Sequence, residues 1–264
     1  MIRWTHAFVD RPEHRLAEAA AFWTAATGTR LSAPRGERGE FATLLADGAD
    51  ACLKLQGVGD HGGGHPDLSV DDVPTTRKAA LDLGATVLDD HADWAVLRSP
   101  GGQPFCLAPW QGQRTRPAVV TAPGGATSRL DQLCLDVSPD LFRAETAFWA
   151  ALTGWESLTG SRPEFHLLRP PAGQPLRFLL QRLDAARPAG AHQDLACSDP
   201  DAVRGWHESL GATEQARGAH WIVMRDPAGG SYCLTGRDPV TGALPVPADP
   251  VADRSPVGEP EPSH

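Results

Sequence analysis

The sequence contains an internal repeat, and this feature constrains the fold more than any other. Residues 3–28 align without a gap with residues 129–154, and residues 65–107 align with residues 192–234. The aligned segments share strings such as Ala-Phe-Trp and Leu-Gly-Ala-Thr. A fold built from two copies places paired residues at related positions. Pairs that stay alike therefore suggest scaffold, and pairs that differ suggest a site.

The repeat also decides the domain organisation. A chain of 264 residues fits one large domain or two of about 120 residues, and the repeat favours two. We expect an N-terminal domain over 1–110, a Pro- and Gly-containing linker over 111–128 and a C-terminal domain over 129–237. From 238 to 264, Pro and acidic residues dominate without apolar periodicity, which predicts a disordered tail.

Charge and cysteine content limit the partners and the compartment. The net charge of −9 disfavours nucleic acid, whose phosphates are bound mainly by clustered Lys and Arg. Of the five cysteines only Cys106 and Cys233 are repeat partners, which favours free thiols over a disulfide framework. We find no signal-peptide pattern and no apolar run near the ~20 residues that span a bilayer. These features predict a cytoplasmic protein without a membrane partner.

Each half has the signals of two βαβββ-like units, four in the chain, which indicates an α+β fold. Residues 4–9 alternate as in a strand, so Trp4, His6 and Phe8 share one face. Helix starts are expected at Pro12 and at Ser138-Pro139, and Gly residues end those helices. The counterparts of the strand face in the second half are Leu130, Gln132 and Cys134. The repeat partners Asp72 and Asp199 are expected to cap the second helix of each half.

These motifs resemble those of a known family. A helix ending in Phe-Trp-x-x-x-Thr-Gly is followed by His-x-Asp-Leu-x-x-x-Asp, by Leu-Gly-Ala-Thr and by a final strand with Cys-Leu. This order resembles the vicinal oxygen chelate superfamily, which includes glyoxalase I, bleomycin-resistance proteins and extradiol dioxygenases, and most of all its actinobacterial glyoxalase-like domain proteins. The resemblance covers residues 3–110 and 129–236. It implies cupped mixed sheets with helices outside and metal ligands, where present, pointing into the cup.

The resemblance also points to individual residues. Carried over by position, it implies site residues His6, Gln56, His65 and Cys106 in the first half, and Gln132, Gln181, His192 and Cys233 in the second. The family's last-strand metal ligand is usually Glu, whereas both copies here have Cys.

A first-half metal set of His6, His65 and Cys106 would suit a softer ion such as Zn²⁺; Fe and Ni also stay open as the divalent metal. The alternative is that Cys106 is a small buried apolar residue. Because Cys is kept in both halves while His6 is replaced by Gln132, we favour scaffold and expect no intact glyoxalase metal site.

Other residues are assigned to ligand binding or to the core. His65 and His192 are each either a ligand or general base or a strand histidine with a structural hydrogen bond. The tryptophan pairs Trp23/Trp149 and Trp94/Trp221 are interpreted as scaffold. We expect the following residues to contact a ligand: Trp4, Phe8, Gln56, Gln132, Gln181 and His192.

Three functions remain open at this stage. The first is binding of a small organic molecule in a cup with aromatic walls. The second is an enzyme of the lyase, isomerase or dioxygenase kind that uses His6 and His65 as catalytic residues, with or without a metal. The third is a non-catalytic regulatory or interaction domain. We expect the halves to pack as an internal pseudo-dimer, with further oligomers open, and the N-terminal cup to be the functional one.

Overall fold

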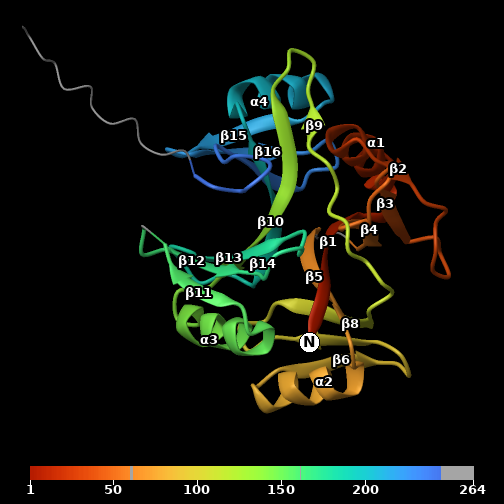
Figure 1. The fold of residues 1–264 in the computed structure, drawn as a ribbon, viewed down its shortest axis with the longest axis vertical. Helices are drawn as coiled ribbons and strands as arrows, with labels where there is room; N and C mark the ends of the chain where they lie inside the picture. Colours follow the sequence, from red (N-terminus) through yellow and green to blue (C-terminus); the bar gives the residue numbers. More distant parts are fainter. Residues whose placement is uncertain (60–61, 161, 245–264) are drawn as a thin grey trace, which may run out of the picture.

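The structure, a computed structural model, describes residues 1–59, 62–160 and 162–244. Each half forms one mixed β-sheet, and the helices lie on the outer faces of the two sheets (Figure 1). The expected tandem α+β fold with two cupped sheets is therefore confirmed. None of the helices in this part of the chain has the length and apolar character needed to cross a bilayer.

The first half has strand order β2-β3-β4-β1-β5-β8-β7-β6, and the second half has the related order β11-β12-β13-β10-β14-β17-β16-β15. The elements of the first half are β1 (Ile2–Pro12), the 3-10 turn η1 (Glu13–Arg15), α1 (Leu16–Thr27), β2 (Arg30–Leu31), β3 (Phe41–Leu45), β4 (Leu53–Val58), β5 (Gly63–Val70), α2 (Val73–Asp82), β6 (Thr86–Asp90), β7 (Ala95–Arg98) and β8 (Pro104–Pro109). Those that follow are β9 (Val120–Thr121), β10 (Thr127–Val137), α3 (Phe142–Thr153), β11 (Glu156–Thr159), β12 (Phe165–Arg169), β13 (Arg177–Arg182), β14 (Gly190–Cys197), α4 (Pro200–Ser209), β15 (Thr213–Arg217), β16 (Trp221–Arg225) and β17 (Ser231–Thr235).

The long central strands set the register of each cup. β1 runs parallel to β4 and antiparallel to β5, which places His6 opposite Asp67 and Phe8 opposite His65. In the second half β10 holds the same place between β13 and β14, and Cys134 lies opposite His192. Because side chains alternate along a strand, the neighbours of the cup residues point the other way into the apolar core.

Most of the predicted helix starts and ends agree with the structure. Asp72 and Asp199 each accept a hydrogen bond from the first turn of their helices, as expected of N-caps. Gly28 and Gly154 end α1 and α3 with φ values of 60° and 66°, a conformation that favours glycine. Pro12 is the N-cap of the turn that leads into α1, whereas the start expected at Ser138-Pro139 is wrong. A 3-10 turn precedes α1, and α3 begins at Phe142, because the long strands run on to Pro12 and Val137.

The segment between the halves is more ordered than a plain linker, because β9 pairs with the start of β10. After β17 the chain makes a turn at Asp238, whose backbone accepts from Gly242 N. Arg129 and Arg177 bind carbonyl groups of this turn. The rest of the expected disordered tail, 245–264, lies outside the described residues.

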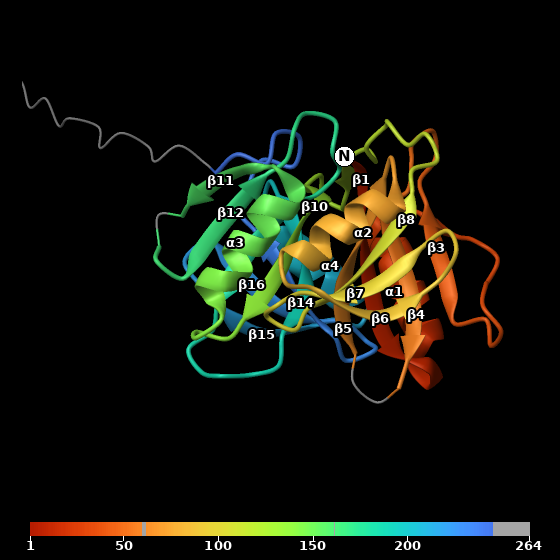
Figure 2. The same cartoon turned by 90° about the horizontal axis from the view of Figure 1, so that it is seen from below.

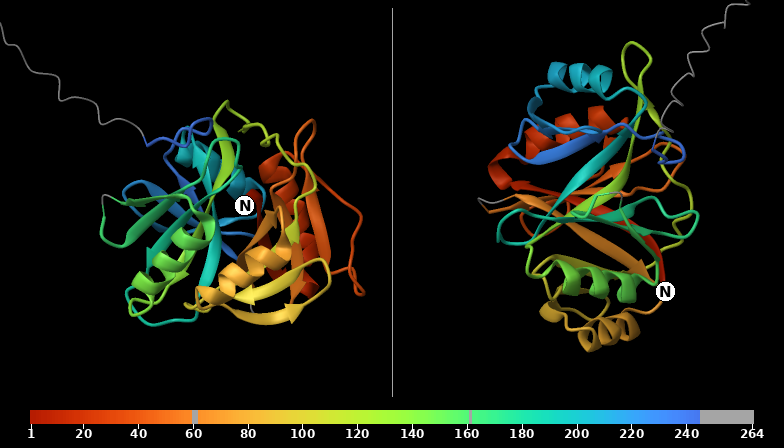
Figure 3. Two further views of the ribbon diagram at one scale, coloured as in Figure 1. Left: turned by 60° about the horizontal axis from the view of Figure 1, so that its bottom comes forward. Right: turned by 90° about the vertical axis from the view of Figure 1, so that its left-hand side faces the viewer.

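The two halves share their helical cores. α1 packs against the last unit of the second half, where Phe22 and Trp23 lie 5.5 and 5.3 Å from the ring of Tyr232. At the opposite end Trp149 of α3 lies 5.1 Å from Phe105 of the first half. Figure 3 shows α1 with α4 at one end of the molecule and α3 with α2 at the other, and Figure 2 shows the α2 and α3 end from below. The halves therefore pack as the expected internal pseudo-dimer.

Polar contacts between the halves are buried as well. Arg11 of β1 forms an ion pair of 2.6 Å with Asp226 in the turn between β16 and β17. Trp23 Nε1 donates to the same carboxylate at 3.0 Å. At the other end, Glu145 of α3 accepts from Ser99 Oγ in the turn between β7 and β8 at 2.5 Å. The acceptor is thus on the turn in one contact and on the helix in the other.

The central strands β5 and β14 also meet where the halves join. Gln193 Nε2 donates to Phe8 O at 2.6 Å. A Cβ atom at Gly64 would lie only 2.9 Å from each of these two atoms. Glycine at this position lets the two sheets approach closely.

The repeated tryptophans do not all belong to the core. Trp23 and Trp149 are completely buried, which confirms them as scaffold. The same interpretation of Trp94 is wrong, since this side chain is 39 % exposed, stacks on His91 and lines a cavity. Its partner Trp221 is half-buried and makes an edge contact with Phe165. Repetition alone did not distinguish core residues from cup residues, because cups are repeated too.

Candidate functional site

The cup of the first half, formed by β1, β4, β5, β7 and β8, contains a cavity of about 490 Å³. We call it the first cup. Three aromatic side chains and several polar ones border it. The lining residues are Phe8, Asp10, Phe41, Gln56, Gly64, His65, Asp67, Asp89, Trp94, Val96, Pro104, Cys106, Leu107 and Ala108.

His65 is held in a fixed orientation in this cup. Its Nδ1 lies 2.7 Å from Asp10 Oδ2, and its ring stacks on Phe8 with centroids 4.3 Å apart. Burial disfavours the charged ring, but the Asp10 carboxylate and the neighbouring Cys106 outweigh it and raise the pKa of His65 to about 10. The side chain is therefore an imidazolium at neutral pH, with Nδ1–H bound to Asp10 and Nε2–H left as a donor.

A second buried ion pair lies beside this histidine. Lys54 Nζ is 2.5 Å from Asp67 Oδ2 and 5.4 Å from the centroid of the Phe8 ring. Burial would raise the pKa of Asp67, but the neighbouring Lys54 ammonium reverses this and lowers it. The first cup thus contains two cations, each matched by a carboxylate, and Lys54 is a residue that the sequence reasoning did not include.

His6 and Trp4 lie behind the cavity rather than on its lining. His6 is 4 % exposed, and its Nδ1 is 3.9 Å from Asp67 Oδ2. Burial and the Lys54 charge lower the pKa of His6 to about 3, so the ring is neutral at physiological pH. Trp4 belongs to the apolar core, and its Nε1 donates to Ala51 O at 2.8 Å.

The depressed pKa of His6 makes stability depend on pH. The unfolded chain takes up a proton at His6 below about pH 6.5 while the folded chain resists it until about pH 3. Stability is therefore lost as pH falls through this window. We expect His6→Gln, which introduces the side chain of the repeat partner Gln132, to reduce the loss between pH 7 and pH 5 by about 2 kcal/mol.

Urea unfolding at the two pH values measures this difference. His14→Gln is the control, because His14 is exposed and should leave the pH dependence as in the wild type. An unchanged pH dependence in His6→Gln would contradict the assignment of a buried neutral ring.

The first cup does not fit the metal set considered from the sequence. Within the described ranges, two groups of three side chains bring possible metal-ligating atoms within 4.8 Å of one another, and both groups are in the second half. His6, His65 and Cys106 do not form such a group. Beside these residues, the Lys54 ammonium forms an ion pair with Asp67.

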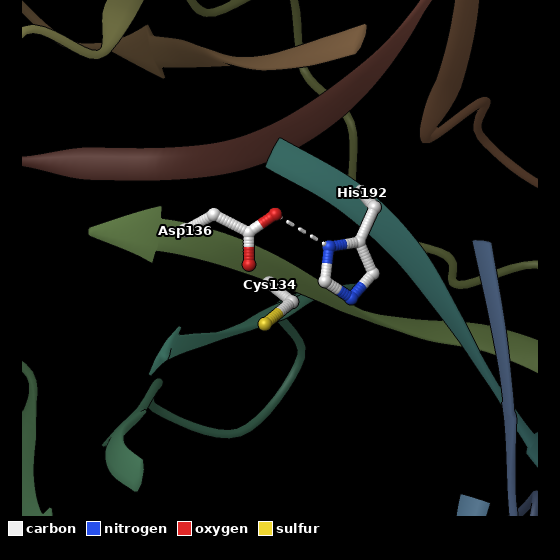
Figure 4. Close-up of side chains that lie close together, drawn as sticks. All are labelled: Cys134, Asp136 and His192. Carbon is white, nitrogen blue, oxygen red and sulfur yellow. Dashed lines mark hydrogen bonds and ion pairs between the residues drawn. The ribbon is translucent and has the colours of Figure 1, made fainter. Parts of the chain in front are cut away.

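Thiol and carboxylate side chains lie close together in the cup of the second half. One group contains Cys134, Asp136 and His192, and the other contains His192, Asp194 and Cys233. Figure 4 shows the first group, with Asp136 reaching His192 across the adjacent strands β10 and β14. We call these five residues the thiol cluster. Three of them, Cys134, Asp136 and Asp194, were not among the predicted site residues, although both aspartates are identical to their repeat partners Asp10 and Asp67.

His192 lies between two carboxylates. Its Nδ1 is 3.1 Å from Asp136 Oδ2, and its Nε2 is 3.4 Å from Asp194 Oδ1. Burial disfavours the charged ring, but neighbouring Cys134 and Asp136 outweigh it and raise the pKa of His192 well above its usual value. Burial raises the pKa of Asp194. The ring therefore has a fixed orientation with one nitrogen on each acid.

The predicted residues Gln132 and Gln181 have protein partners. Gln132 Nε2 donates to Asp194 Oδ2 at 2.5 Å, and its Oε1 accepts from Arg237 at 2.6 Å. Gln181 Oε1 lies 3.6 Å from Cys134 Sγ. Gln132 is thus held at both ends of its amide, while Gln56 of the first half borders the cavity.

Two comparisons with known proteins place this architecture in a family. The family model described as a glyoxalase-like domain matches the chain twice, over residues 6–108 and 132–235. The chain belongs to the glyoxalase-like domain family. This match confirms the expected kinship with glyoxalase-like proteins, and the solved structures that the chain resembles share its fold.

The similar structures agree in fold at low identity. The Mn(II)-bound glyoxalase from Novosphingobium aromaticivorans superposes with a TM-score of 0.63 at 17% identity, covering 92% of this chain and 87% of that one. The 2,2',3-trihydroxybiphenyl 1,2-dioxygenase from Sphingomonas wittichii gives 0.57 at 15%, covering 89% and 90%. A variant of 4-hydroxymandelate synthase from Streptomyces coelicolor gives 0.58 at 16%, covering 87% and 91%. No curated protein matches the sequence.

Proposed function

We propose that the first cup binds a small planar organic molecule. The observation that carries this proposal is the cavity of about 490 Å³ between Phe8, Phe41 and Trp94. Its size lies within the about 300–1,000 Å³ usual for ligand sites, and aromatic walls with a few polar groups are the usual composition. The comparison structures support a small-molecule role, because several are named as enzymes of small aromatic compounds.

The polar groups suggest how such a molecule would be oriented. The stacked Phe8 and His65 rings offer a flat wall, and His65 Nε2–H and Gln56 offer hydrogen bonds to a carbonyl or phenolic oxygen. Both cations in the cup already have carboxylate partners. The site therefore suits an uncharged or phenolic compound better than a strongly charged one, since a strong anion would compete with Asp10 and Asp67.

Trp94 offers a matched test of binding. We expect catechols, phenols and aromatic ketones to raise the unfolding temperature in a concentration-dependent way. Trp94→Ala should weaken the best ligand by about five-fold, equivalent to about 1 kcal/mol for one aromatic contact. Trp221→Ala, the repeat partner in the second half, should leave the affinity unchanged. Equal losses in both variants, or no stabilising compound among the three classes, would count against the first cup.

A second candidate is an enzyme that uses the same cavity. The observation that favours it is the His65–Asp10 pair, which places an oriented proton donor at the cavity wall. Turnover of a dicarbonyl or catechol substrate that is lost in His65→Gln while ligand stabilisation persists would support catalysis. Stabilisation without turnover would support a binding protein. The five free cysteines support our proposal that either activity operates in the cytoplasm.

A further inference from the structure

We propose that Cys106 is a reactive thiol in the first cup and that it captures phenolic α,β-unsaturated carbonyl compounds as covalent thioether adducts. This inference rests on the proposed function and extends it, because it names the chemical class of the ligand and a bond that forms in the same cavity. Cys106, His65 and Asp67 all line that cavity. The proposed ligand site therefore contains a nucleophile, a cation and a carboxylate.

Cys106 is the cysteine best placed to react with a small molecule from solution. It is half-buried and borders the cavity, whereas the other four cysteines are buried. Burial raises the pKa of each of these four thiols and keeps them protonated at neutral pH. Because the thiolate is the nucleophile, we expect them to be inert. They are Cys52, Cys134, Cys197 and Cys233.

The cation beside this thiol is the imidazolium of His65. The Asp10 carboxylate holds His65 Nδ1 at 2.7 Å, so Nε2–H is directed elsewhere in the cup. A hydrogen bond from the ring to Cys106 Sγ is among the contacts that raise the pKa of His65. A protonated imidazole next to a thiol stabilises the thiolate that attacks an electrophile. The pair therefore has the arrangement of an activated cysteine.

A buried carboxylate oxygen in the same cavity lacks a donor. Asp67 is 4 % exposed, and Lys54 binds its Oδ2, but its Oδ1 accepts no hydrogen bond from the described residues. Asp67 is also the partner of Cys106 in the pairing of β5 with β8. Buried acceptors are normally satisfied, and a phenolic hydroxyl of the ligand would supply the missing donor. This oxygen is the reason for choosing phenolic compounds.

The walls and the polar groups suit addition of the thiol to a flat electrophile. Phe8, Phe41 and Trp94 border the cavity. Cys106 Sγ loses its proton to solvent and bonds to the β-carbon, while the C=C electron pair moves toward the carbonyl oxygen, to which His65 Nε2–H donates. The α-carbon of the enolate then takes up a proton. An S–H bond and a C=C π bond are consumed, a C–S and a C–H bond form, and no oxidant or reductant is needed.

Three maleimides separate the contributions of the walls and of the carboxylate. N-methylmaleimide has no aromatic ring, N-phenylmaleimide adds the ring, and N-(4-hydroxyphenyl)maleimide adds the phenol. Each rate with the native protein is divided by the rate of the same reagent with glutathione. We expect the ring to accelerate labelling about five-fold and the hydroxyl to add about another five-fold. Intact mass and peptide mapping should find the adduct at Cys106.

Variants test the thiol and its cation. Cys106→Ser should lose the adduct, while Cys233→Ser, which changes the buried repeat partner, should keep it. His65→Gln should lower the maximal rate with the hydroxyphenyl reagent by about ten-fold and change the half-saturating concentration much less, a split that a purely structural role of His65 would not give. Far-UV circular dichroism confirms that each variant is folded.

N-(4-hydroxyphenyl)succinimide, which lacks the double bond, distinguishes this inference from the binding function on which it rests. It should raise the unfolding temperature and slow the labelling of Cys106 without forming an adduct. Stabilisation by the succinimide without a preference of Cys106 for the hydroxyphenyl maleimide overturns the covalent step alone. Neither stabilisation nor preference overturns both proposals. A faster adduct at another cysteine of the folded protein, or an unchanged rate in His65→Gln, also overturns the role of Cys106.

Discussion

Asp226→Ala is expected to lower the free energy of unfolding by about 3–5 kcal/mol, because it leaves the Arg11 guanidinium buried without its anion. Both side chains of this pair are at most 1 % exposed. The same substitution removes the acceptor of Trp23 Nε1 and that of Gly230 N. The loss should therefore appear as a large shift of the urea midpoint, and because the contact joins the two halves it should loosen their packing.

Two further variants serve as controls for that result. Lys78→Ala removes an exposed i,i+4 ion pair with Asp82 and should change stability by no more than about 0.5 kcal/mol. The double variant Arg11→Met/Asp226→Leu removes both charges together and should lose less than the sum of the two single variants. Additive losses would mean that Arg11 and Asp226 do not act as a pair.

Glu145→Ala is expected to have the second-largest effect, about 3 kcal/mol, because two buried donors and one partly buried donor lose a charged acceptor. These donors are Ser99 Oγ at 2.5 Å, Gly101 N at 2.6 Å and Trp149 Nε1 at 2.7 Å. Glu145→Gln keeps the shape and one acceptor oxygen, so it should lose about half as much. Chemical denaturation of both variants measures the effect.

Glu208→Ala is the control on a second-half helix, where the carboxylate pairs with Arg204 at the surface. It should cost less than about 1 kcal/mol. A similar loss in Glu208→Ala and Glu145→Ala would contradict the role of the buried contact between the halves.

The two contacts explain why the halves pair with each other. In both, a tryptophan N–H of the first helix needs a buried acceptor. Trp23 obtains it from Asp226 on the turn of the opposite half, while Trp149 obtains it from Glu145 on its own helix, which also binds Ser99 on the opposite turn. Two copies of the first half paired together would have no acid in the contact between helix and turn, and two copies of the second half would have two. Sequence divergence between the repeats has therefore made the contact specific.

The repeat and the family motifs were sufficient to predict the fold. Alternation along residues 4–9 correctly placed Phe8 on the cup, but the lining of the cavity depends on register and depth as well. Trp4 shares the face of Phe8 on this strand, yet its ring belongs to the apolar core and does not line the cavity. The alternation of side chains along the strand does not show which residues of one face reach the cavity.

The charged groups of the cups were harder to predict. Lys54 stands opposite Phe8 only because β4 runs parallel to β1, and a long parallel pairing is not visible in local sequence. Asp136 and Asp194 reach His192 from two strands. They are identical to their partners in the first half, so the comparison between repeats classified them as scaffold. Cys134, which replaces Phe8, takes part in only one of the two groups of possible metal-ligating side chains. The other group, His192, Asp194 and Cys233, has identical residues at the corresponding positions of the first half.

The central claim is that the first cup is the ligand site of this protein, and calorimetric titration of the best-stabilising catechol, phenol or aromatic ketone into the wild type, Trp94→Ala and Trp221→Ala tests it most directly. The cavity between Phe8, Phe41 and Trp94 predicts a 1:1 complex that Trp94→Ala weakens by about five-fold and that Trp221→Ala leaves unchanged. Equal weakening in both variants, or weakening by Trp221→Ala alone, would contradict it.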